Sequence, residues 1–361
     1  MQLGFVIDHA KCIGCHACTV ACKSENDVPL GDFRTWVKYT EEGTFPQVKR
    51  SFAVLRCNQC TAAPCVTICP VNALEKGANG IVDVDPAICI GCKACMQGSH
   101  HDALYLNEQS DTAEKCHFCA HRVEVGLAPA CVVVCPTEAL IPGDFHDPAS
   151  EVSRLRREHD LAVRKPEAGT RPNVFYKDTH PATLDPNQTD GSTGYLWSEN
   201  RNATQQAAER SRRQAEPAAS RTSYDVDHKV HWGGKVSAYL WTKSIAAGAA
   251  IFAAAESWLG RPDSVPLLLG ASLVFLLATA ALLLADLKRP ERFWRLLLKP
   301  NWDSWLARGS FIITGFGVLL TAALVLSLAG GLHGFVGNAV LALLIALAGL
   351  TACYNDWLFA H

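Results

Sequence analysis

Sixteen cysteines dominate the chemistry available to this chain of 361 residues. All of them except Cys353 lie between Cys12 and Cys135, and their spacing divides them into four groups. The groups are Cys12-x2-Cys15-x2-Cys18-x3-Cys22, Cys57-x2-Cys60-x4-Cys65-x3-Cys69, Cys89-x2-Cys92-x2-Cys95, and Cys116-x2-Cys119 with Cys131-x3-Cys135. A tight loop with this spacing can wrap three thiolates around one metal centre, and thiolates are the soft ligands that zinc and iron–sulfur clusters select.

Three kinds of site use many cysteines: disulfides, zinc sites and iron–sulfur clusters. Disulfides are not expected, because residues 1–10 show neither a secretory signal nor a twin-arginine pair, and cytosolic thiols stay reduced. Zinc sites use two separated ligand pairs, whereas the CxxCxxC triplet occurs twice here and no nearby histidine recurs at a fixed offset. The run C-x2-C-x2-C-x3-C binds [4Fe–4S] cubes in bacterial proteins, with its fourth cysteine reaching a second cube. Iron–sulfur clusters are therefore the prediction.

An internal repeat surrounds the cysteines. The stretch Asp8-His-Ala-Lys-Cys12-Ile-Gly-Cys15 is echoed by Asp85-Pro-Ala-Ile-Cys89-Ile-Gly-Cys92. After Cys-Pro, Val71-Asn-Ala-Leu74 is echoed by Thr137-Glu-Ala-Leu140. Short β-prone stretches at 51–55 and 80–84 flank the loops. The repeat predicts two ferredoxin-like α+β units with four cluster positions in total.

Residues 1–177 resemble the four-cluster iron–sulfur subunits of molybdopterin oxidoreductases, of the polysulfide reductase and dimethyl sulfoxide reductase type. The resemblance rests on the four cysteine groups and on phrases such as Glu114-Lys-Cys-His-Phe-Cys119 and Cys131-Val-Val-Val-Cys-Pro136. In that family the first group pairs with the fourth and the second with the third. The implied ligand sets are Cys12, Cys15, Cys18 and Cys135 for cluster 1, Cys22, Cys116, Cys119 and Cys131 for cluster 2, Cys69, Cys89, Cys92 and Cys95 for cluster 3, and Cys57, Cys60 and Cys65 for cluster 4.

Cluster 4 departs from the family pattern, because Ser99 stands where the fourth cysteine belongs. Three thiolates favour a [3Fe–4S] cluster, which is the first hypothesis. Alternatively, the Ser99 oxygen or an imidazole of His100 or His101 completes a [4Fe–4S] cube. A third alternative is an empty, degenerate site that the fold tolerates. The expected cofactors are thus three [4Fe–4S] clusters and a fourth cluster of one of these kinds.

The second half of the chain contains four apolar stretches at about 236–259, 265–287, 309–330 and 335–353. About 20 apolar residues suffice to cross a bilayer as a helix, so each stretch predicts a transmembrane helix. Segment 288–308 carries six basic residues and two acidic ones, whereas 260–264 contains one basic residue. Basic loops stay in the cytoplasm. We therefore expect a multi-pass protein of the bacterial or archaeal cytoplasmic membrane, with its iron–sulfur domain on the cytoplasmic side.

Ionisable residues inside a membrane span mark candidate ion, proton or ligand sites. Lys243 and Glu256 lie in the first span, although both could extend towards the interface. Cys353 lies in the last span and is expected to be a small core residue.

Residues 228–361 resemble the quinone-binding membrane subunit of the NrfD or polysulfide reductase C family. The matching phrases are Tyr239-Leu-Trp-Thr-Lys-Ser-Ile-Ala-Ala-Gly248, Asp286-Leu-Lys-Arg-Pro290 and Ser304-Trp-Leu-Ala-Arg-Gly309. The resemblance implies a quinone site near the first helices, with His231, Lys235, Tyr239 and Lys243 as candidates. Members of that family have about twice as many helices, which implies either a piece of a longer chain or a further membrane subunit that completes the bundle.

Together these features predict a double ferredoxin-like domain at 1–143, a linker or partner-wrapping segment at 144–227, and an all-α transmembrane domain of about four helices at 228–361. The expected function is electron transfer between a membrane quinone pool and a molybdopterin catalytic partner, combined with membrane anchoring. The alternative is a quinone-linked, proton-translocating module fed by a ferredoxin or hydrogenase. Near-neutral charge argues against nucleic-acid binding, and neither GxGxxG nor GxxxxGK[ST] occurs.

Overall fold

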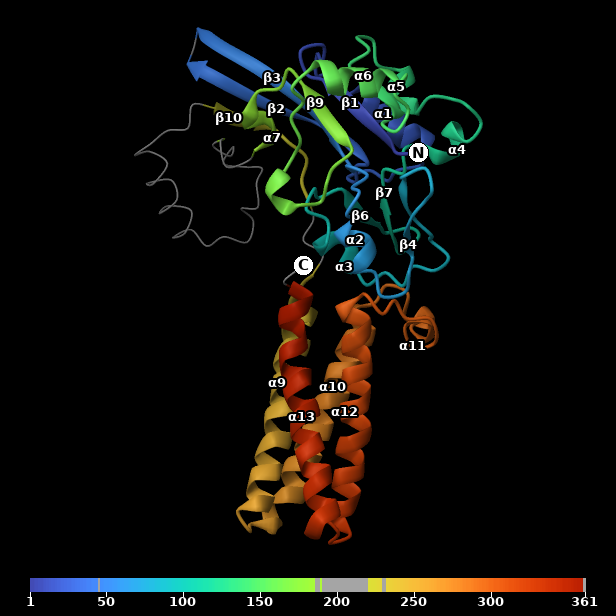
Figure 1. The fold of residues 1–361 in the computed structure, drawn as a ribbon. Coiled ribbons are helices and arrows are strands. Elements are labelled where there is room, and N and C mark those ends of the chain that lie inside the picture. The colour runs from blue at the N-terminus through green and yellow to red at the C-terminus, as the bar shows by residue number, and fades with distance from the viewer. Residues whose placement is uncertain (45, 186–188, 190–219, 229–231, 360–361) are drawn as a thin grey trace. The chain divides into compact units, whose positions relative to one another are not determined.

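Two compact units make up the computed structural model, which describes residues 1–44, 46–185, 189, 220–228 and 232–359. The first unit comprises Met1–Val66, Leu74–Asp85 and Cys95–Lys229, and it mixes strands with short helices (Figure 1). The second comprises Thr67–Ala73, Pro86–Ala94 and Val230–His361, and long helices dominate it. Two short cysteine-bearing segments therefore belong to the helical unit rather than to the unit that surrounds them in sequence.

The central sheet of the first unit is built around β1 (Leu3–Asp8), every residue of which is buried. Strand β8 (Leu140–Asp144) pairs antiparallel with one edge of β1, and β9 (Val174–Lys177) pairs parallel with the other. The sheet thus joins residues almost 170 positions apart. Helix α6 (Glu151–Glu158) contributes two buried apolar residues to the cluster around Val6.

A second sheet has the order β10 (Ser220–Tyr224), β2 (Thr35–Thr44) and β3 (Gln47–Arg56), and all its neighbours are antiparallel. Two hairpins complete the strands, namely β4 (Leu74–Lys76) with β5 (Val82–Val84) and β6 (Leu104–Asn107) with β7 (Thr112–Lys115). The two hairpins follow the second and third cysteine groups, in keeping with the repeat seen in the sequence.

Short helices follow or contain the cysteine loops. They are α1 (Ala17–Glu25), α2 (Pro64–Thr67), α3 (Ala94–Gln97), α4 (Ala120–Val123) and α5 (Ala130–Val133). Two further short elements, η1 (Pro166–Ala168) and α7 (Pro181–Leu184), lie later in the unit.

The segment 144–227 does more than connect the two halves. Helix α6 and strands β9 and β10 all come from it, and both strands extend sheets of the first unit. Most of the polar stretch between β9 and β10, including 190–219, lies outside the described residues. The boundary at residue 143 and the wrapping of a partner stay predictions.

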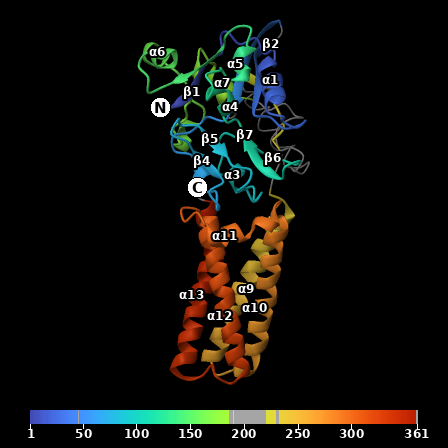
Figure 2. The same cartoon turned by 90° about the vertical axis from the view of Figure 1, so that its right-hand side faces the viewer.

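Four long helices form the second unit: α9 (Gly234–Trp258), α10 (Val265–Asp286), α12 (Trp305–Leu328) and α13 (Gly334–Phe359). Each is long and apolar enough to cross a membrane, and they lie side by side (Figure 2). The short elements η4 (Pro262–Ser264), η5 (Pro290–Arg292) and α11 (Trp294–Leu298) connect them. The expected fold class is confirmed, although α12 starts before the predicted 309 and α13 continues past the predicted 353.

Small residues allow close packing between α9 and α10. Ala246, Ala250 and Ala253 of α9 are completely buried. The Ser272 hydroxyl of α10 donates to the Ala246 carbonyl at 2.7 Å, and the hydroxyls of Thr242 and Thr279 lie 2.8 Å apart. Small residues and side-chain hydrogen bonds are what associate helices in lipid.

Cys353 is not the core residue that the sequence led us to expect, because its side chain is exposed on α13. Its neighbours Thr351, Tyr354 and Asn355 are buried, so they occupy the inward face of the helix. When a helix is apolar on all sides, the sequence pattern does not indicate which residues face the core.

Candidate iron–sulfur centres

A left-handed residue recurs in all four cysteine loops. In the first CxxC pair of each group, the residue before the second cysteine has a positive φ, namely Gly14 at 70°, Gln59 at 45°, Gly91 at 66° and Phe118 at 61°. This conformation turns the backbone sharply within the loop. Glycine is needed at position 14 for a second reason, since a Cβ there would lie 2.5 Å from the Phe52 ring. The loops are therefore shaped by the backbone, before any metal is considered.

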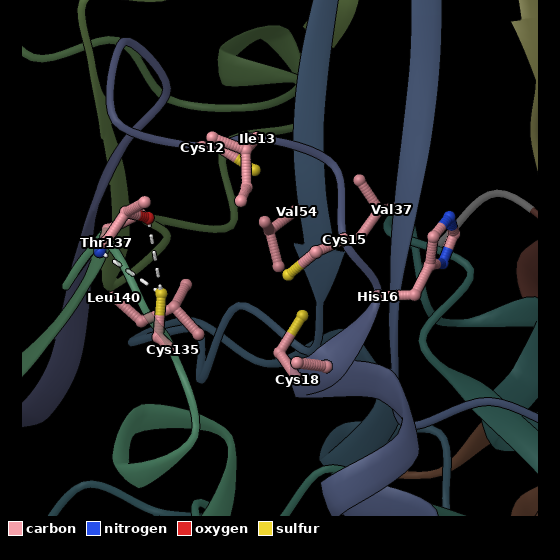
Figure 3. Close-up of a pocket in the computed structure, with 12 residues that line it drawn as sticks. Cys12, Ile13, Cys15, His16, Cys18, Val37, Val54, Cys135, Thr137 and Leu140 are labelled. Atoms are coloured by element: carbon pink, nitrogen blue, oxygen red, sulfur yellow. Dashed lines mark hydrogen bonds between the residues drawn. The ribbon is translucent and has the colours of Figure 1, made fainter.

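The four predicted ligands of cluster 1 line one cavity of about 330 Å³. Figure 3 shows the sulfurs of Cys12, Cys15, Cys18 and Cys135 turned towards a shared space, with His16 pointing away. Burial opposes ionisation of Cys135, but hydrogen bonds from Ala139 and its neighbours outweigh it and lower the pKa of the thiol. Apolar side chains such as Val37 and Val54 also line the cavity.

The predicted ligands of cluster 2 are also neighbours. Burial, followed by the charges of Cys116, Cys131 and Cys119, raises the pKa of the Cys22 thiol. The side-chain amide of Asn26 lies 3.7 Å from the Cys22 sulfur and 4.0 Å from the Cys119 sulfur. Helix α1 thus carries Cys18 to one ligand set and Cys22, one turn later, to the next.

Three of the predicted ligands of cluster 3, Cys69, Cys89 and Cys92, lie in the second unit. Burial and the nearby charges of Cys69 and Cys89 raise the pKa of Cys92 to about 12. The backbone N–H of Ala73 donates to the Cys69 sulfur at 3.2 Å, and that of Gly91 donates to the Cys89 sulfur at 3.4 Å. Cys95, the fourth member, begins the next segment of the first unit in sequence.

Residues between α10 and α12 hold the backbone of these loops. The Arg292 guanidinium donates to the carbonyls of Cys89 at 2.8 Å and Pro86 at 2.6 Å. The Asn301 side chain donates to the Cys69 carbonyl at 2.8 Å, and its backbone N–H donates to Pro70 at 2.9 Å. We call this set of bonds the loop clamp.

Further bonds of the loop clamp come from neighbouring residues. The Ser304 hydroxyl donates to the Ile68 carbonyl at 2.6 Å, and the backbone N–H of Arg289 donates to the Ile90 carbonyl at 3.2 Å. Lys93 forms an ion pair with Asp286 at the end of α10, at 2.8 Å. The loop clamp therefore engages both ligand segments of cluster 3 in the second unit.

The cluster 4 residues line a cavity of about 350 Å³, close in size to that of cluster 1. Cys57, Cys60, Cys65 and Ser99 all contribute to its wall. The Ser99 hydroxyl accepts a hydrogen bond from the Ala103 backbone N–H at 3.4 Å. The sulfurs of Cys69 and Cys135 accept the same bond from the residue four positions later. Ser99 therefore has the local geometry of a crossing ligand.

Two histidines share the cluster 4 cavity. His100 and His101 both line it. The His101 Nε2 lies 3.2 Å from the Thr170 hydroxyl, while its Nδ1 has no hydrogen-bond partner among the described residues. Burial lowers the pKa of His101 to about 3, so the ring is neutral at physiological pH. Both Ser99 and His101 thus present an oxygen or nitrogen that a cluster iron can accept.

The donor set and the cavities fit iron–sulfur clusters. Backbone N–H groups donate hydrogen bonds to the sulfurs of Cys69, Cys89 and Cys135, and such bonds are usual around iron–sulfur clusters. Within the described ranges, no three His, Cys, Asp or Glu side chains approach closely enough to hold a single metal ion. The assignment of each cysteine to a particular cluster stays a prediction.

The membrane helices bring two of the four quinone candidates together. Tyr239 and Lys243 lie one turn apart on α9 and are buried. Lys243 is only 1 % exposed, and its ammonium donates to the Ala352 carbonyl at 3.2 Å and lies 4.6 Å from the centre of the Tyr354 ring. The Asn355 side chain lies 3.5 Å from the Tyr239 hydroxyl. Tyr354 and Asn355 of α13 were not predicted, although polar residues inside an apolar span are a usable signal.

Lys235 and His231 are the remaining quinone candidates, and Glu256 is the second ionisable residue of the first span. Lys235 is exposed, and its ammonium donates to the Ala285 carbonyl at 2.8 Å. His231 lies outside the described residues. Glu256 lies near the end of α9, where it is 3.7 Å from the Arg261 guanidinium and close to the Ser264 hydroxyl. Glu256 therefore has local polar partners.

Comparison with known proteins matches both halves of the chain. A 4Fe-4S dicluster domain matches residues 48–145, and the family described as "Polysulphide reductase, NrfD" matches residues 223–354. A tetrathionate reductase subunit of Salmonella typhimurium is 43 % identical over 190 residues, covering 51 % of this chain and 76 % of the relative. The arsenate respiratory reductase iron–sulfur subunit ArrB of Shewanella sp. is 38 % identical over 224 residues, covering 49 % and 96 %. A polysulfide reductase polypeptide of Wolinella succinogenes is 37 % identical over 177 residues, covering 48 % and 93 %.

This chain belongs to the family of reductase iron–sulfur subunits. It binds iron–sulfur clusters and transfers electrons, and it carries an NrfD-type membrane domain in the same polypeptide. The expected family, function class and membrane character are thereby confirmed.

Proposed function

We propose that this iron–sulfur subunit carries electrons between a quinone bound in its NrfD-type domain and a molybdopterin-containing catalytic partner. The observation that carries the proposal is the loop clamp. The backbone of two predicted cluster 3 ligands, Cys69 and Cys89, is hydrogen-bonded to the segment joining α10 and α12, and three of the four predicted ligands belong to the same folded unit as the membrane helices. An electron leaving a quinol in this unit has a cluster available within the same structure.

The polar group around Lys243 supports quinone binding. A quinone needs hydrogen-bond donors for its carbonyl oxygens, and its reduction needs protons. Lys243 and Asn355 supply N–H groups and Tyr239 supplies a hydroxyl, all in otherwise apolar helices. Buried polar residues at this depth mark functional sites more often than structural ones.

Cluster 1 is the proposed exchange point with the catalytic partner. Cys15 is exposed, and apolar side chains near the cluster 1 ligands are open to solvent, with Ile13 57 %, Val20 65 % and Val133 62 % exposed. Exposed apolar residues grouped around a redox centre suit a protein interface. The relative from tetrathionate reductase is named as a subunit, in keeping with such a partner.

For the membrane, we propose the cytoplasmic membrane of a bacterium or archaeon, with the loop clamp on the cytoplasmic side. The basic segment 288–308 carries the clamp residues, and basic loops remain inside. The ligand segments bonded to it lie on that same side.

Purification of the native complex from membranes tests this function. We expect a molybdenum-containing subunit to co-purify and added quinol to bleach the visible absorbance of the clusters. A nickel–iron partner in its place would instead support the hydrogenase-fed alternative. A colourless protein containing zinc and no iron would overturn both.

A further inference from the structure

Arg56 is a fully buried cation with no carboxylate partner among the residues that the structure describes. It ends β3, directly before Cys57, and none of its surface is exposed. In the part of the chain that the structure describes, no carboxylate lies within ion-pair distance of it, and its Nε and Nη2 donate to nothing. Burying a lone charge is costly, so an enclosed cation is expected to face an anion.

The only hydrogen bond of the Arg56 guanidinium among the described residues goes to a predicted cluster ligand. Its Nη1 donates to the Cys131 sulfur at 3.4 Å. On the other side, the guanidinium carbon lies 4.3 Å from the centre of the Phe5 ring, which packs on Phe118 at 4.4 Å. Two aromatic rings and the end of a strand therefore fix where the charge lies.

The charge of Arg56 acts on two ligand sets. The thiols of Cys131, Cys116 and Cys18 all lie close enough to the Arg56 guanidinium to interact with its charge, and Cys131 is the one bonded to it. Cys131 and Cys116 belong to predicted cluster 2, whereas Cys18 belongs to predicted cluster 1. Cys22, the crossing ligand of cluster 2, is a further thiol within reach of this charge.

A fixed positive charge has a defined effect on such clusters. A cube held by four thiolates is already an anion, and reduction adds one electron without breaking a bond. The cation stabilises the reduced form more than the oxidised form, and an N–H···S bond acts in the same direction. Both contributions raise the reduction potential, and both weaken steeply with distance.

We propose that Arg56 is a positioning residue for electron transfer, which raises the reduction potential of cluster 2 most and that of cluster 1 less through its buried charge and its bond to Cys131. The proposal rests on the proposed function, in which these clusters carry the electrons, and on the ligand sets that the family resemblance implies. It makes cluster 2 the more readily reduced of the two sites that share this cation, other influences being equal.

The test is a redox titration of the purified, membrane-extracted protein with dithionite, monitored by EPR. In Arg56→Gln, the EPR signal of reduced cluster 2 should appear only at a lower potential than in the parent. At a fixed potential, the ratio of reduced to oxidised cluster 2 should fall at least tenfold, which equals a shift of about 59 mV for one electron. A smaller shift is expected for cluster 1. Arg164→Gln is the matched control, because Arg164 is also buried but is 3.7 Å from the carboxylate of Asp102. It should leave both signals unchanged.

Unchanged potentials in Arg56→Gln with full iron content would overturn the proposal. If Arg56→Gln does not assemble its clusters, the titration is repeated with Arg56→Lys, which keeps the positive charge but loses the planar hydrogen-bond donor. It should lower the cluster 2 potential by a smaller amount, and an unchanged potential there contradicts the proposal. Dithionite needs neither quinone nor partner, so a protein that titrates normally but is not reduced by quinol would overturn the proposed function alone.

Discussion

The hydroxyl of Ser99 accepts a hydrogen bond from the backbone N–H of Ala103, four residues later, at 3.4 Å. The sulfurs of Cys69 and Cys135 accept the equivalent bond from Ala73 and Ala139. The cavity beside Ser99, at about 350 Å³, is also similar in size to that of cluster 1, at about 330 Å³. Both facts favour a site that still holds a cluster over an empty, degenerate one.

Replacing Ser99 by cysteine should supply the missing thiolate. We expect the oxidised parent protein to show a three-iron EPR signal and to contain about 15 irons, the sum of three cubes and one three-iron cluster. Ser99→Cys should lose that signal and gain about one iron per chain. Ser99→Ala is the control and should keep the signal. A parent protein without any three-iron signal would support completion of the cube by Ser99, His100 or His101 if it contained about 16 irons, and an empty site if it contained about 12.

Weakening the loop clamp should loosen cluster 3 selectively. Arg292→Ala and Asn301→Ala each remove donors to ligand-loop carbonyls, and such bonds contribute about 1 kcal/mol each. The double variant should therefore lose iron to a chelator several-fold faster than the parent, with the cluster 3 EPR signal disappearing first. Lys299→Ala, an exposed residue in the same segment, is the control. Equal loss of all clusters would count against a selective role of the clamp.

Quinol oxidation should depend on Lys243 and Tyr239. Lys243→Met and Tyr239→Phe each remove a donor, and a lost hydrogen bond of about 1.4 kcal/mol corresponds to a tenfold effect. We expect the rate of cluster reduction by added quinol, measured by stopped-flow absorbance, to fall at least tenfold. Reduction by dithionite should be unaffected.

Ser244→Ala provides the control for these variants, because Ser244 is a polar residue exposed on the same helix, next to Lys243 in sequence. It should retain a rate within about twofold of the parent. Normal quinol rates in both Lys243→Met and Tyr239→Phe would remove this polar group from the quinone pathway.

The stability of the first unit should fall in mild acid because of His9. Burial lowers the pKa of His9 to about 4, although Asp8 opposes this, and its Nδ1 lies 2.7 Å from the Thr179 hydroxyl. The unfolded chain, with a histidine pKa of about 6.5, binds more protons between pH 6.5 and 4. The free energy of unfolding should therefore decrease as the pH falls through this window, by up to about 3 kcal/mol.

Native-state hydrogen exchange of the β1 amides at several pH values measures this effect. His9→Asn keeps a polar side chain but does not titrate, so it should flatten the pH dependence between 6.5 and 4. His146→Asn, at an exposed position, should leave it unchanged. An equally steep dependence in His9→Asn would assign the acid sensitivity to other groups.

Much of this architecture could be predicted from local spacing. The cysteine groups predicted where the loops lie, because three ligands on one tight turn impose a short, regular spacing. Hydropathy likewise located the four helices, since a bilayer requires long apolar segments. The gap at Ser99 was visible for the same reason, as a departure from a repeated pattern.

Long-range contacts could not be predicted in this way. The pairing of β1 with β9, the partnership of Arg56 with Cys131, and the loop clamp all join residues far apart in sequence. No sequence pattern marks Arg56 or Asn301, because the role of each residue depends on which loop the fold places beside it. The orientation of Cys353 was predicted wrongly for a related reason: helix-face assignment depends on which neighbours pack there.

The loop clamp also constrains how the protein is made. The carbonyls of Cys69 and Cys89 receive their donors from residues that follow α10, which the ribosome delivers roughly 200 residues after the cysteines themselves. Cluster 3 can therefore reach its final hydrogen bonding only once α10 and the segment after it have been synthesised and inserted. Maturation of this metal centre and insertion of the membrane domain should accordingly be coupled, with the ligand loops completing their hydrogen bonds only after the helices are in place.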